Sequence, residues 1–272
     1  MAADFNVEIP NRLSEGAWHG HVIFAQWIIQ VLKPSIFVEL GTHNGDSYFS
    51  FCQSVKKNNL PTRCHAVDTW KGESQAGFYD EEVFASVNQY NNENYSAFSI
   101  LHRCLFDEAV DRFDDGSIDL LHIDGFHSYE AVSHDFHTWL PKLSPDAIVL
   151  FHDTNEIKEG YGVWKLWKEL EPKYPKTHFC FLHSHGLGVL GIGNTYPLPL
   201  QKLFRANSKE IDAYRDFFSH LTDLLKEPVE IKRKNLRNKL INIYINTGNG
   251  LSENEREKLP LSKNKGEITF NL

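Results

Sequence analysis

The chain has 272 residues, of which 41% are hydrophobic, so it can form one large domain or a domain with an extension. Its formal net charge is −8, and no basic block stands out in the first 200 residues, which argues against a nucleic-acid groove. No apolar run approaches the ~20 residues of a membrane span, and the first residues lack the pattern of a secretory signal. The four cysteines are scattered, as in reduced cytoplasmic proteins. We therefore expect a cytoplasmic protein with a sizeable core.

Short apolar runs alternate with longer helical patterns through most of the chain, which is typical of βαβ units and a mainly parallel sheet. The last two apolar runs are joined by the tight turn Ser184-His185-Gly186 and predict an antiparallel hairpin. The expected fold class is α/β, with a Rossmann-like, doubly wound, mainly parallel seven-stranded sheet that ends in this hairpin. The runs that predict strands are residues 36–40, 64–68, 98–103, 118–124, 147–152, 178–183 and 188–193, and helices are expected near 19–32, 45–57, 129–140 and 162–170.

The composition changes after Pro197. Residues 207–245 alternate charged and apolar positions, as one or two amphipathic helices do, and residues 252–272 are polar. The basic stretch Lys232-Arg233-Lys234 is more typical of a solvated helix face than of a binding site. We therefore predict one domain over residues 1–196, followed by a helical and polar C-terminal extension over residues 197–272.

A glycine motif follows the first predicted strand. Gly41 lets the chain turn closely past a ligand, and Gly45 opens the next helix. The spacing G-x-x-x-G differs from the G-x-G-x-x-G of pyrophosphate sites, and the carboxylate of Glu39 would repel phosphate but suits the ammonium and sulfonium groups of S-adenosylmethionine. The second strand ends in Asp68, where an acid can accept hydrogen bonds from both ribose hydroxyls. A glycine pair alone would equally fit an ordinary turn, but Glu39 and Asp68 favour a nucleoside pocket.

These motifs resemble the class I S-adenosylmethionine-dependent methyltransferases, and above all the sugar O-methyltransferases of macrolide and surface-polysaccharide biosynthesis. The residues that carry the resemblance are Glu39-Leu40-Gly41-x-x-x-Gly45-x-Ser47, Asp68 and His122-Ile123-Asp124-Gly125-x-His127. The resemblance covers about residues 15–195 and excludes the C-terminal tail. It implies a methyltransferase domain over residues 1–196 that acts on a hydroxyl of a small-molecule or glycan substrate, with a glycosyltransferase or a second copy of the chain as further partners.

The resemblance also implies where the cofactor binds. We expect the residues that contact S-adenosylmethionine to be Glu39, Gly41, Thr42, Gly45, Ser47, Asp68, Trp70 and Asp124. The glycine-containing, aromatic segment from Trp70 to Tyr79 follows the second strand on the same edge of the sheet. This segment is either a lid that excludes water or an ordinary connecting loop.

Acidic and histidine side chains end two neighbouring strands. The fourth strand ends in Asp124 and the fifth in His152-Asp153, and adjacent parallel strands deliver such side chains to one edge of the sheet. By resemblance, Asp124 and Asp153 hold a divalent metal, His152 is a third ligand, and His127 is the general base. His152 replaces a Glu of the related proteins. Imidazole suits Mn²⁺ or Fe²⁺, whereas Mg²⁺ prefers oxygen, so all three metals remain candidates.

Several alternatives remain open at this stage. Asp124 could cap the following helix, and His127 could bind only backbone groups. A non-haem iron oxygenase would use His127, His152 and Asp153 as a two-histidine-one-carboxylate triad, although such an enzyme needs no nucleoside pocket. A non-catalytic binding module attached to a glycan enzyme is the third possibility. His122, inside a strand, is expected to be a core histidine.

Overall fold

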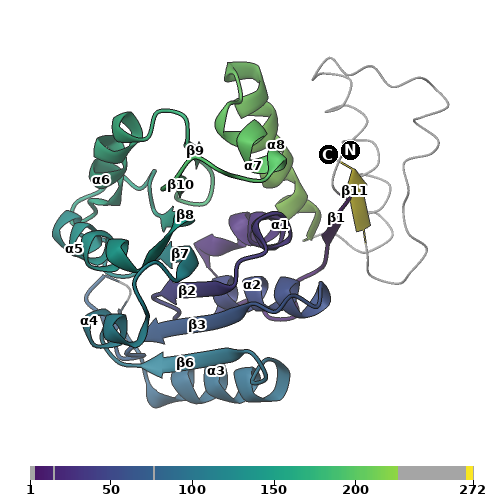
Figure 1. Ribbon diagram of the computed structural model, residues 1–272. Helices are drawn as coiled ribbons and strands as arrows, with labels where there is room; N and C mark the ends of the chain where they lie inside the picture. The colour runs from purple at the N-terminus through teal and green to yellow at the C-terminus, as the bar shows by residue number, and fades with distance from the viewer. Residues whose placement is uncertain (1–3, 15, 76, 226–267, 272) are drawn as a thin grey trace.

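The computed structural model describes residues 4–14, 16–75, 77–225 and 268–271. Seven strands form one sheet in the order β6-β3-β2-β7-β8-β10-β9 (Figure 1). The first five of these strands run parallel, and β10 is antiparallel to both β8 and β9, as the predicted hairpin requires. The predicted fold class is therefore confirmed. The strands are β2 (Ile36–Leu40), β3 (Arg63–Asp68), β6 (Ser99–Arg103), β7 (Ile118–Ile123), β8 (Leu143–His152), β9 (His178–Phe181) and β10 (Leu187–Gly191).

Helices cover both faces of the sheet (Figure 1). Strand β2 is buried on both sides, since Phe37 packs in one hydrophobic cluster and Val38 and Leu40 in the other, which explains its continuous apolar sequence. One face carries η1 (Ala17–His21), α1 (Val22–Leu32), α2 (Asp46–Lys57), α3 (Glu81–Asn94), α7 (Leu198–Phe204) and α8 (Ser208–Leu225). The other carries α4 (Phe106–Ala109), η2 (Val110–Arg112), α5 (Tyr129–Trp139), η3 (Leu140–Lys142), α6 (Val163–Leu170) and η4 (Glu171–Lys173).

Some elements differ from those expected. The first predicted helix starts as the 3₁₀ turn η1, and α1 ends at Leu32 because Lys33 adopts a left-handed conformation with φ of 50°. Helix α3 was not predicted, because it buries only Val87 and Asn91 and therefore lacks a clear apolar stripe. The short hairpin of β4 (Gly72–Glu73) and β5 (Gly77–Phe78) lies inside the predicted lid segment. Strand β1 (Asp4–Val7) pairs with β11 (Ile268–Asn271).

The described part of the C-terminal extension packs on the sheet domain. The Phe218 ring of α8 lies 5.4 Å from the rings of both Phe24 and Phe181, measured between ring centroids. The amphipathic pattern over residues 207–245 thus forms helix α8 as far as Leu225. The rest of that pattern, the basic stretch and the polar segment up to residue 267 lie outside the described residues. None of the described helices has the length and apolar character that crossing a membrane requires.

Candidate active site

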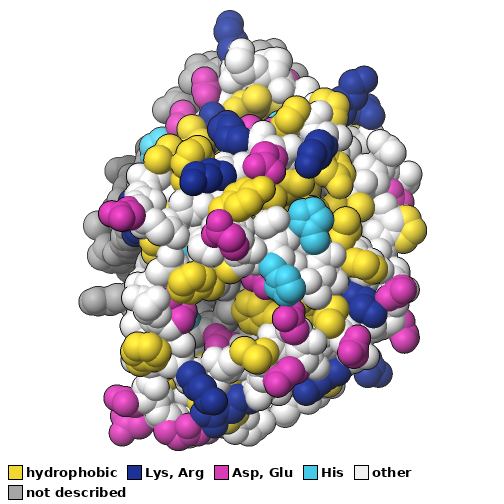
Figure 2. Space-filling view, turned by 90° about the vertical axis from the view of Figure 1, so that its left-hand side faces the viewer, with side chains coloured by type: hydrophobic (Ala, Val, Ile, Leu, Met, Phe, Trp, Pro, Cys, Tyr) yellow, Lys and Arg dark blue, Asp and Glu magenta, His cyan; other side chains and the backbone are white. Residues whose placement is uncertain are grey.

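A cavity of about 570 Å³ opens at the carboxyl ends of the parallel strands. This is the edge of the sheet where ligands bind in folds of this kind, and the volume lies in the range of small-molecule sites. Its walls come from the segment before η1, the β2–α2 loop, the ends of β3, β7 and β8, the segment after β6 and part of α5. Figure 2 shows a hollowed face on which acidic, histidine and hydrophobic side chains gather.

The glycine motif forms a tight turn at the wall of this cavity. Gly41 has φ of +86°, and a Cβ atom there would lie 2.0 Å from the carbonyl oxygen of Asp124. Gly45 has φ of +83°, and its Cβ would lie 2.5 Å from the Phe49 ring. Contacts within the protein therefore already require glycine at both positions. Thr42 lines the cavity, and its buried hydroxyl has no hydrogen-bond partner among the described residues.

The carboxylate of Asp68 lines the cavity and ties two loops together. One oxygen accepts hydrogen bonds from the backbone N–H groups of Thr42, at 2.8 Å, and His43, at 2.9 Å. Among the described residues, the one donor to the other oxygen is the N–H of Trp70, at 2.7 Å, which leaves that oxygen a lone pair for a further hydrogen bond. Ser47 also lines the cavity. Trp70 does not: its ring is buried, packs against Phe84 and donates to the backbone of His43, so it supports the loop from outside.

Glu39 lies behind the cavity wall and not in it. Its side chain is fully buried, and Oε2 lies 2.9 Å from Nδ1 of His122, the residue directly opposite on β7. The other ring nitrogen of His122 accepts a hydrogen bond from Trp18 at 3.3 Å. Burial raises the pKa of Glu39, and His122 partly offsets this effect. The geometry thus gives no support to direct contact between Glu39 and the cofactor, whereas His122 is a core histidine as expected.

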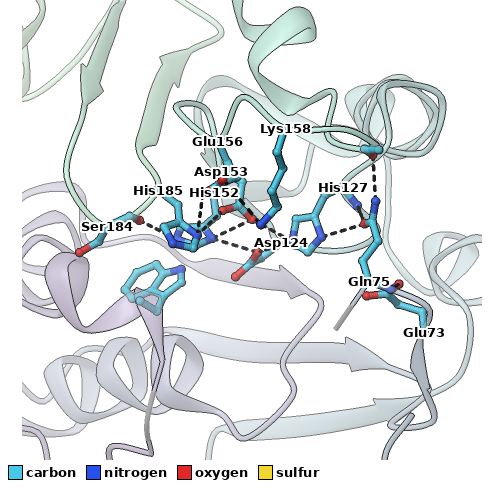
Figure 3. Close-up of polar contacts among 12 residues, drawn as sticks. Glu73, Gln75, Asp124, His127, His152, Asp153, Glu156, Lys158, Ser184 and His185 are labelled. Carbon is cyan, nitrogen blue, oxygen red and sulfur yellow. Dashed lines mark hydrogen bonds and ion pairs between the residues drawn. The ribbon is translucent and has the colours of Figure 1, made fainter. Parts of the chain in front are cut away.

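Asp124, His127, His152 and Asp153 converge at one end of the cavity (Figure 3). Nδ1 of His152 lies 3.2 Å from Oδ1 of Asp124 and 3.3 Å from Oδ2 of Asp153. The same Oδ2 lies 2.8 Å from Nε2 of His127. Asp124, His152 and Asp153 each offer one ligand atom, and these atoms lie within 4.8 Å of one another. The four residues predicted for metal binding and proton transfer are therefore neighbours.

Charges within this cluster act strongly on one another. Burial alone would lower the pKa of His127, but hydrogen bonds to Asp124 and Asp153 outweigh it and raise the pKa to about 9. Burial is likewise outweighed at His152, where the charge of Asp124 leads the effects that raise the pKa to about 10. Burial would raise the pKa values of Asp124 and Asp153, but their histidine partners hold both well below the usual range. The two negatively charged carboxylates thus stabilise nearby positive charge, which either protonated histidines or a bound metal cation can supply.

A second group of possible metal ligands adjoins the first and was not predicted. His185 places Nδ1 3.2 Å from Oδ1 of Asp153 and 3.3 Å from Oε2 of Glu156. Asp153 and His185 both have positive φ, 61° and 66°, which is strained for residues other than glycine. The sequence marked the segment around His185 only as a turn. The pairing of β10 with β8 brings that turn beside Asp153.

The predicted lid segment contacts the predicted base. Oε1 of Gln75 accepts a hydrogen bond from the backbone N–H of His127 at 3.0 Å and lies 3.1 Å from Nδ1 of the same residue. Nε2 of Gln75 donates to the carbonyl of Gly160 at 2.8 Å, and the ring of Tyr161 stacks on His127 with centroids 4.9 Å apart. Figure 3 shows Gln75 reaching toward His127. Sequence analysis did not identify Gln75 as a site residue, because a single glutamine in a loop belongs to no recognisable motif.

Residues 38–154, which include the glycine turn, Asp68 and the whole cluster of Asp124, His127, His152 and Asp153, match a family model described as a methyltransferase domain. This part of the chain is therefore similar to a methyltransferase domain. The match supports the predicted enzyme class, a methyltransferase. The match favours this class over the oxygenase and the binding module that the sequence left open.

Two similar proteins place the domain in context. The chain is 48% identical over 189 residues to the uncharacterized protein y4gI of Sinorhizobium fredii, a match that covers 70% of this chain. The chain spans only 20% of that relative's length, so the relative is a much longer protein. The fold resembles the crystal structure of a putative caffeoyl-CoA O-methyltransferase from Staphylococcus aureus, with a TM-score of 0.51 and 13% identity over 67% of this chain and 86% of that one.

Proposed function

We propose that this protein transfers the methyl group of S-adenosylmethionine to a sugar hydroxyl, and that a divalent cation orients the acceptor. The observation that carries the proposal is the position of His127. Its Nε2 atom lies 2.8 Å from Asp153, within the cluster that includes Asp124 and His152, at the cavity that Thr42 and Asp68 also line. A base, a set of cation ligands and a nucleoside-sized cavity thus share one site.

The residues of the cavity fit the cofactor. Thr42 offers a buried hydroxyl that has no partner among the described residues, and Asp68 retains an acceptor lone pair, as recognition of ribose hydroxyls requires. Bound S-adenosylmethionine supplies an electrophilic methyl group. The tasks of the protein are then to align the acceptor oxygen with that methyl group and to take one proton. In this proposal Ser47 and Asp124 also contact the cofactor, whereas Glu39 and Trp70 act from behind the wall.

The residues of the cluster also fit a divalent cation. Asp124, His152 and Asp153 provide two carboxylates and one imidazole with ligand atoms within 4.8 Å of one another. A cation held by these residues would offset the charge of the two carboxylates and lower the pKa of a nearby hydroxyl. The imidazole favours Mn²⁺ or Fe²⁺ over Mg²⁺, which prefers oxygen ligands.

We assign His127 as the general base, with Nε2 as the atom that takes the proton. The oxygen of Gln75 accepts the backbone N–H of His127, so it is an acceptor, and the Nδ1 atom that faces it must carry its own hydrogen. Nε2 is then the ring nitrogen with a lone pair in the neutral imidazole. In its 2.8 Å contact with the carboxylate of Asp153 this atom carries a proton, so His127 would act as a base only once the charge of that carboxylate is offset.

A sugar acceptor in glycan or polysaccharide biosynthesis is supported by the resemblance of the motifs to sugar O-methyltransferases. The aromatic side chains of Tyr79, Phe126 and Tyr161 line the same cavity, and flat rings of this kind can cover the apolar face of a sugar. A glycosyltransferase that supplies or extends the glycan is the partner that this function would require.

The test begins with calorimetry of S-adenosylhomocysteine binding to the full chain, with and without Mn²⁺ or Mg²⁺. We expect binding that the Asp68→Ala variant weakens by roughly 10-fold or more, while the Asp111→Ala variant, altered at an exposed acid of η2, binds like the parent. Mass spectrometry of nucleotide sugars and oligosaccharides incubated with S-adenosylmethionine and Mn²⁺ then identifies the acceptor. Absence of binding would refute the cofactor, and methylation confined to non-sugar hydroxyls would refute the sugar.

A further inference from the structure

The backbone carbonyl of Ser184 is a common acceptor for two histidine rings behind the proposed cation ligands. Its oxygen lies 3.2 Å from Nε2 of His152 (Figure 3) and 3.2 Å from Nε2 of His21. A carbonyl oxygen has two lone pairs and only accepts hydrogen bonds, so each of these nitrogens must carry a hydrogen. The Nε2 atom of His152 is therefore a donor, and it cannot at the same time bind a cation.

The other ring nitrogen of His152 faces the carboxylates. Nδ1 lies 3.2 Å from Oδ1 of Asp124 and 3.3 Å from Oδ2 of Asp153. In a neutral imidazole one nitrogen carries the hydrogen and the other the lone pair. With the hydrogen on Nε2, the lone pair lies on Nδ1. Histidine ligands in metal sites commonly donate their second N–H to a carbonyl group, which fixes both the tautomer and the orientation of the ring.

The N-terminal turn η1 packs against this carbonyl group. Nε2 of His183 lies 3.0 Å from the carbonyl oxygen of Gly20, and a Cβ atom built on Gly20 would lie 1.9 Å from Oγ of Ser184. His21, the next residue of η1, is fully buried, and its ring lies 5.7 Å from that of His152, measured between centroids. The contact between η1 and the β9–β10 turn thus has no room for a methyl group at Gly20, and it determines where the carbonyl lies.

We propose that the carbonyl group of Ser184, supported by η1, positions His152 so that Nδ1 is the nitrogen that binds the divalent cation. The inference rests on the cation site of the proposed function. Gly20 and Ser184 act through His152 and are not ligands themselves. If the carbonyl moved away, the ring could rotate about its Cβ–Cγ bond, Nδ1 would be beside the carboxylates for less of the time, and the cation would bind more weakly.

The test measures Mn²⁺ affinity by calorimetry in full-chain variants that displace or keep the carbonyl. Gly20→Ala places a methyl group against Ser184, so it should weaken Mn²⁺ binding by roughly 10- to 100-fold, as changes in groups that support metal ligands do. Ser184→Gly keeps the carbonyl, and glycine suits the φ of 48° at this residue, so this variant should bind Mn²⁺ like the parent. Combining Ser184→Gly with Gly20→Ala removes the two atoms closest to the added methyl group, so the affinity should largely recover.

Two further comparisons separate positioning from a general loss of structure. Gly193→Ala is the matched control, since its Cβ would lie 2.2 Å from Oδ1 of Asp146, beyond the opposite end of β10. It should lower stability in chemical denaturation and leave the Mn²⁺ affinity unchanged. His152→Glu has no N–H to donate to the carbonyl, so adding Gly20→Ala to it should not weaken Mn²⁺ binding further. Equal weakening of Mn²⁺ binding by Gly20→Ala in the parent and in His152→Glu would mean that its effect does not pass through His152.

The ligating atom is identified by NMR of the parent with isotope-labelled histidine nitrogens and bound Cd²⁺, a diamagnetic substitute for Mn²⁺ whose nucleus couples to the nitrogen it binds. Coupling to Nδ1 of His152, with the hydrogen retained on Nε2, is the expected result. Coupling to Nε2 would overturn the inference, even if Gly20→Ala does not fold. An unchanged Mn²⁺ affinity in folded Gly20→Ala would overturn it as well, while the cation site itself would stand. If the parent binds neither Mn²⁺ nor Cd²⁺, the proposed cation fails, and the inference fails with it.

Discussion

Gln75 and His127 are joined by two contacts to a single oxygen: Oε1 of Gln75 lies 3.0 Å from the backbone nitrogen of His127 and 3.1 Å from its ring Nδ1. The backbone contact fixes the oxygen as an acceptor, and the ring contact then fixes the tautomer of the imidazole. A residue of the short β4–β5 hairpin thus determines which ring nitrogen of the proposed base is free.

Gln75→Ala should therefore lower kcat by about 10-fold and leave the KM for S-adenosylmethionine close to that of the parent, because positioning of the base is lost and not cofactor binding. Gln75→Glu keeps an acceptor for the Nδ1 hydrogen and should recover part of the rate. Gln89→Ala, at an exposed position of α3, is the control. Equal kcat values for Gln75→Ala and the parent would show that Gln75 does not position His127.

Replacement of the base itself should have a larger effect. We expect His127→Ala to reduce methyl transfer by roughly 10²-fold or more, with near-normal binding of S-adenosylhomocysteine. The control is His137→Ala, which removes an exposed histidine from α5. Single-turnover rates measure methyl transfer, and calorimetry measures the binding of S-adenosylhomocysteine. If His127→Ala transfers methyl groups at the rate of the parent, the base is another residue, and His152 is the first candidate.

The preference of the proposed site for one divalent cation over another should depend on which side chains act as ligands. His152→Glu would convert two carboxylates and an imidazole into three carboxylates, so we expect the ratio of Mg²⁺ to Mn²⁺ affinity to rise. Asp124→Asn should weaken both metals. Metal content after dialysis, with competition between the two ions, measures these changes. His178→Glu, altered at a histidine of β9 outside the cavity lining, is the matched control. An unchanged metal preference in His152→Glu would exclude His152 as a ligand.

The sequence predicted most of the sheet and the proximity of the acids and histidines for a simple physical reason. Parallel strands deliver their carboxyl ends to one edge, so Asp124 and Asp153, which follow neighbouring strands, had to lie near each other. The face of a strand to which one side chain points is harder to predict when both faces are buried. Glu39 therefore seemed free to contact a ligand, but its pairing with His122 across β2 and β7 directs it into the core.

Other residues of the site depend on tertiary contacts that no local pattern encodes. His185 reaches Asp153 only because β10 pairs with β8, and Gln75 reaches His127 only because the β4–β5 hairpin folds over the cavity. Asp135 looks like any polar residue of an amphipathic helix. Its burial beside Gly125 becomes evident only when α5 is packed on the sheet.

The turn at Gly41 offers a test of close packing. Gly41→Ala adds a Cβ atom 2.0 Å from the carbonyl oxygen of Asp124 at a residue with φ of +86°, so we expect a loss of stability of about 2 kcal/mol or more and weaker metal binding through displacement of Asp124. Gly116→Ala is a matched control, since Gly116 has φ of +71° and no atom within 4 Å of the added Cβ. Chemical denaturation of both variants separates the contact from the backbone strain. Equal losses of stability in Gly41→Ala and Gly116→Ala would mean that the turn at Gly41 can shift to accommodate the added Cβ atom.

The last prediction concerns Asp135 and the pH dependence of stability in the absence of ligand. Burial raises the pKa of this acid from its usual value near 4 to about 7, so between these pH values the folded state holds a proton that the unfolded state has released.

The free energy of unfolding of the parent should therefore fall as the pH rises from about 4 to about 7 through this group, and the loss is complete above that range. Asp135→Asn carries no titratable proton, so its stability advantage over the parent should grow across this window and reach at most a few kcal/mol. Urea denaturation at several pH values measures the difference, and Asp111→Asn, at an exposed site, shows what loss of an ordinary acid does. A constant difference between parent and Asp135→Asn would mean that Asp135 titrates normally and that its burial is relieved by solvent.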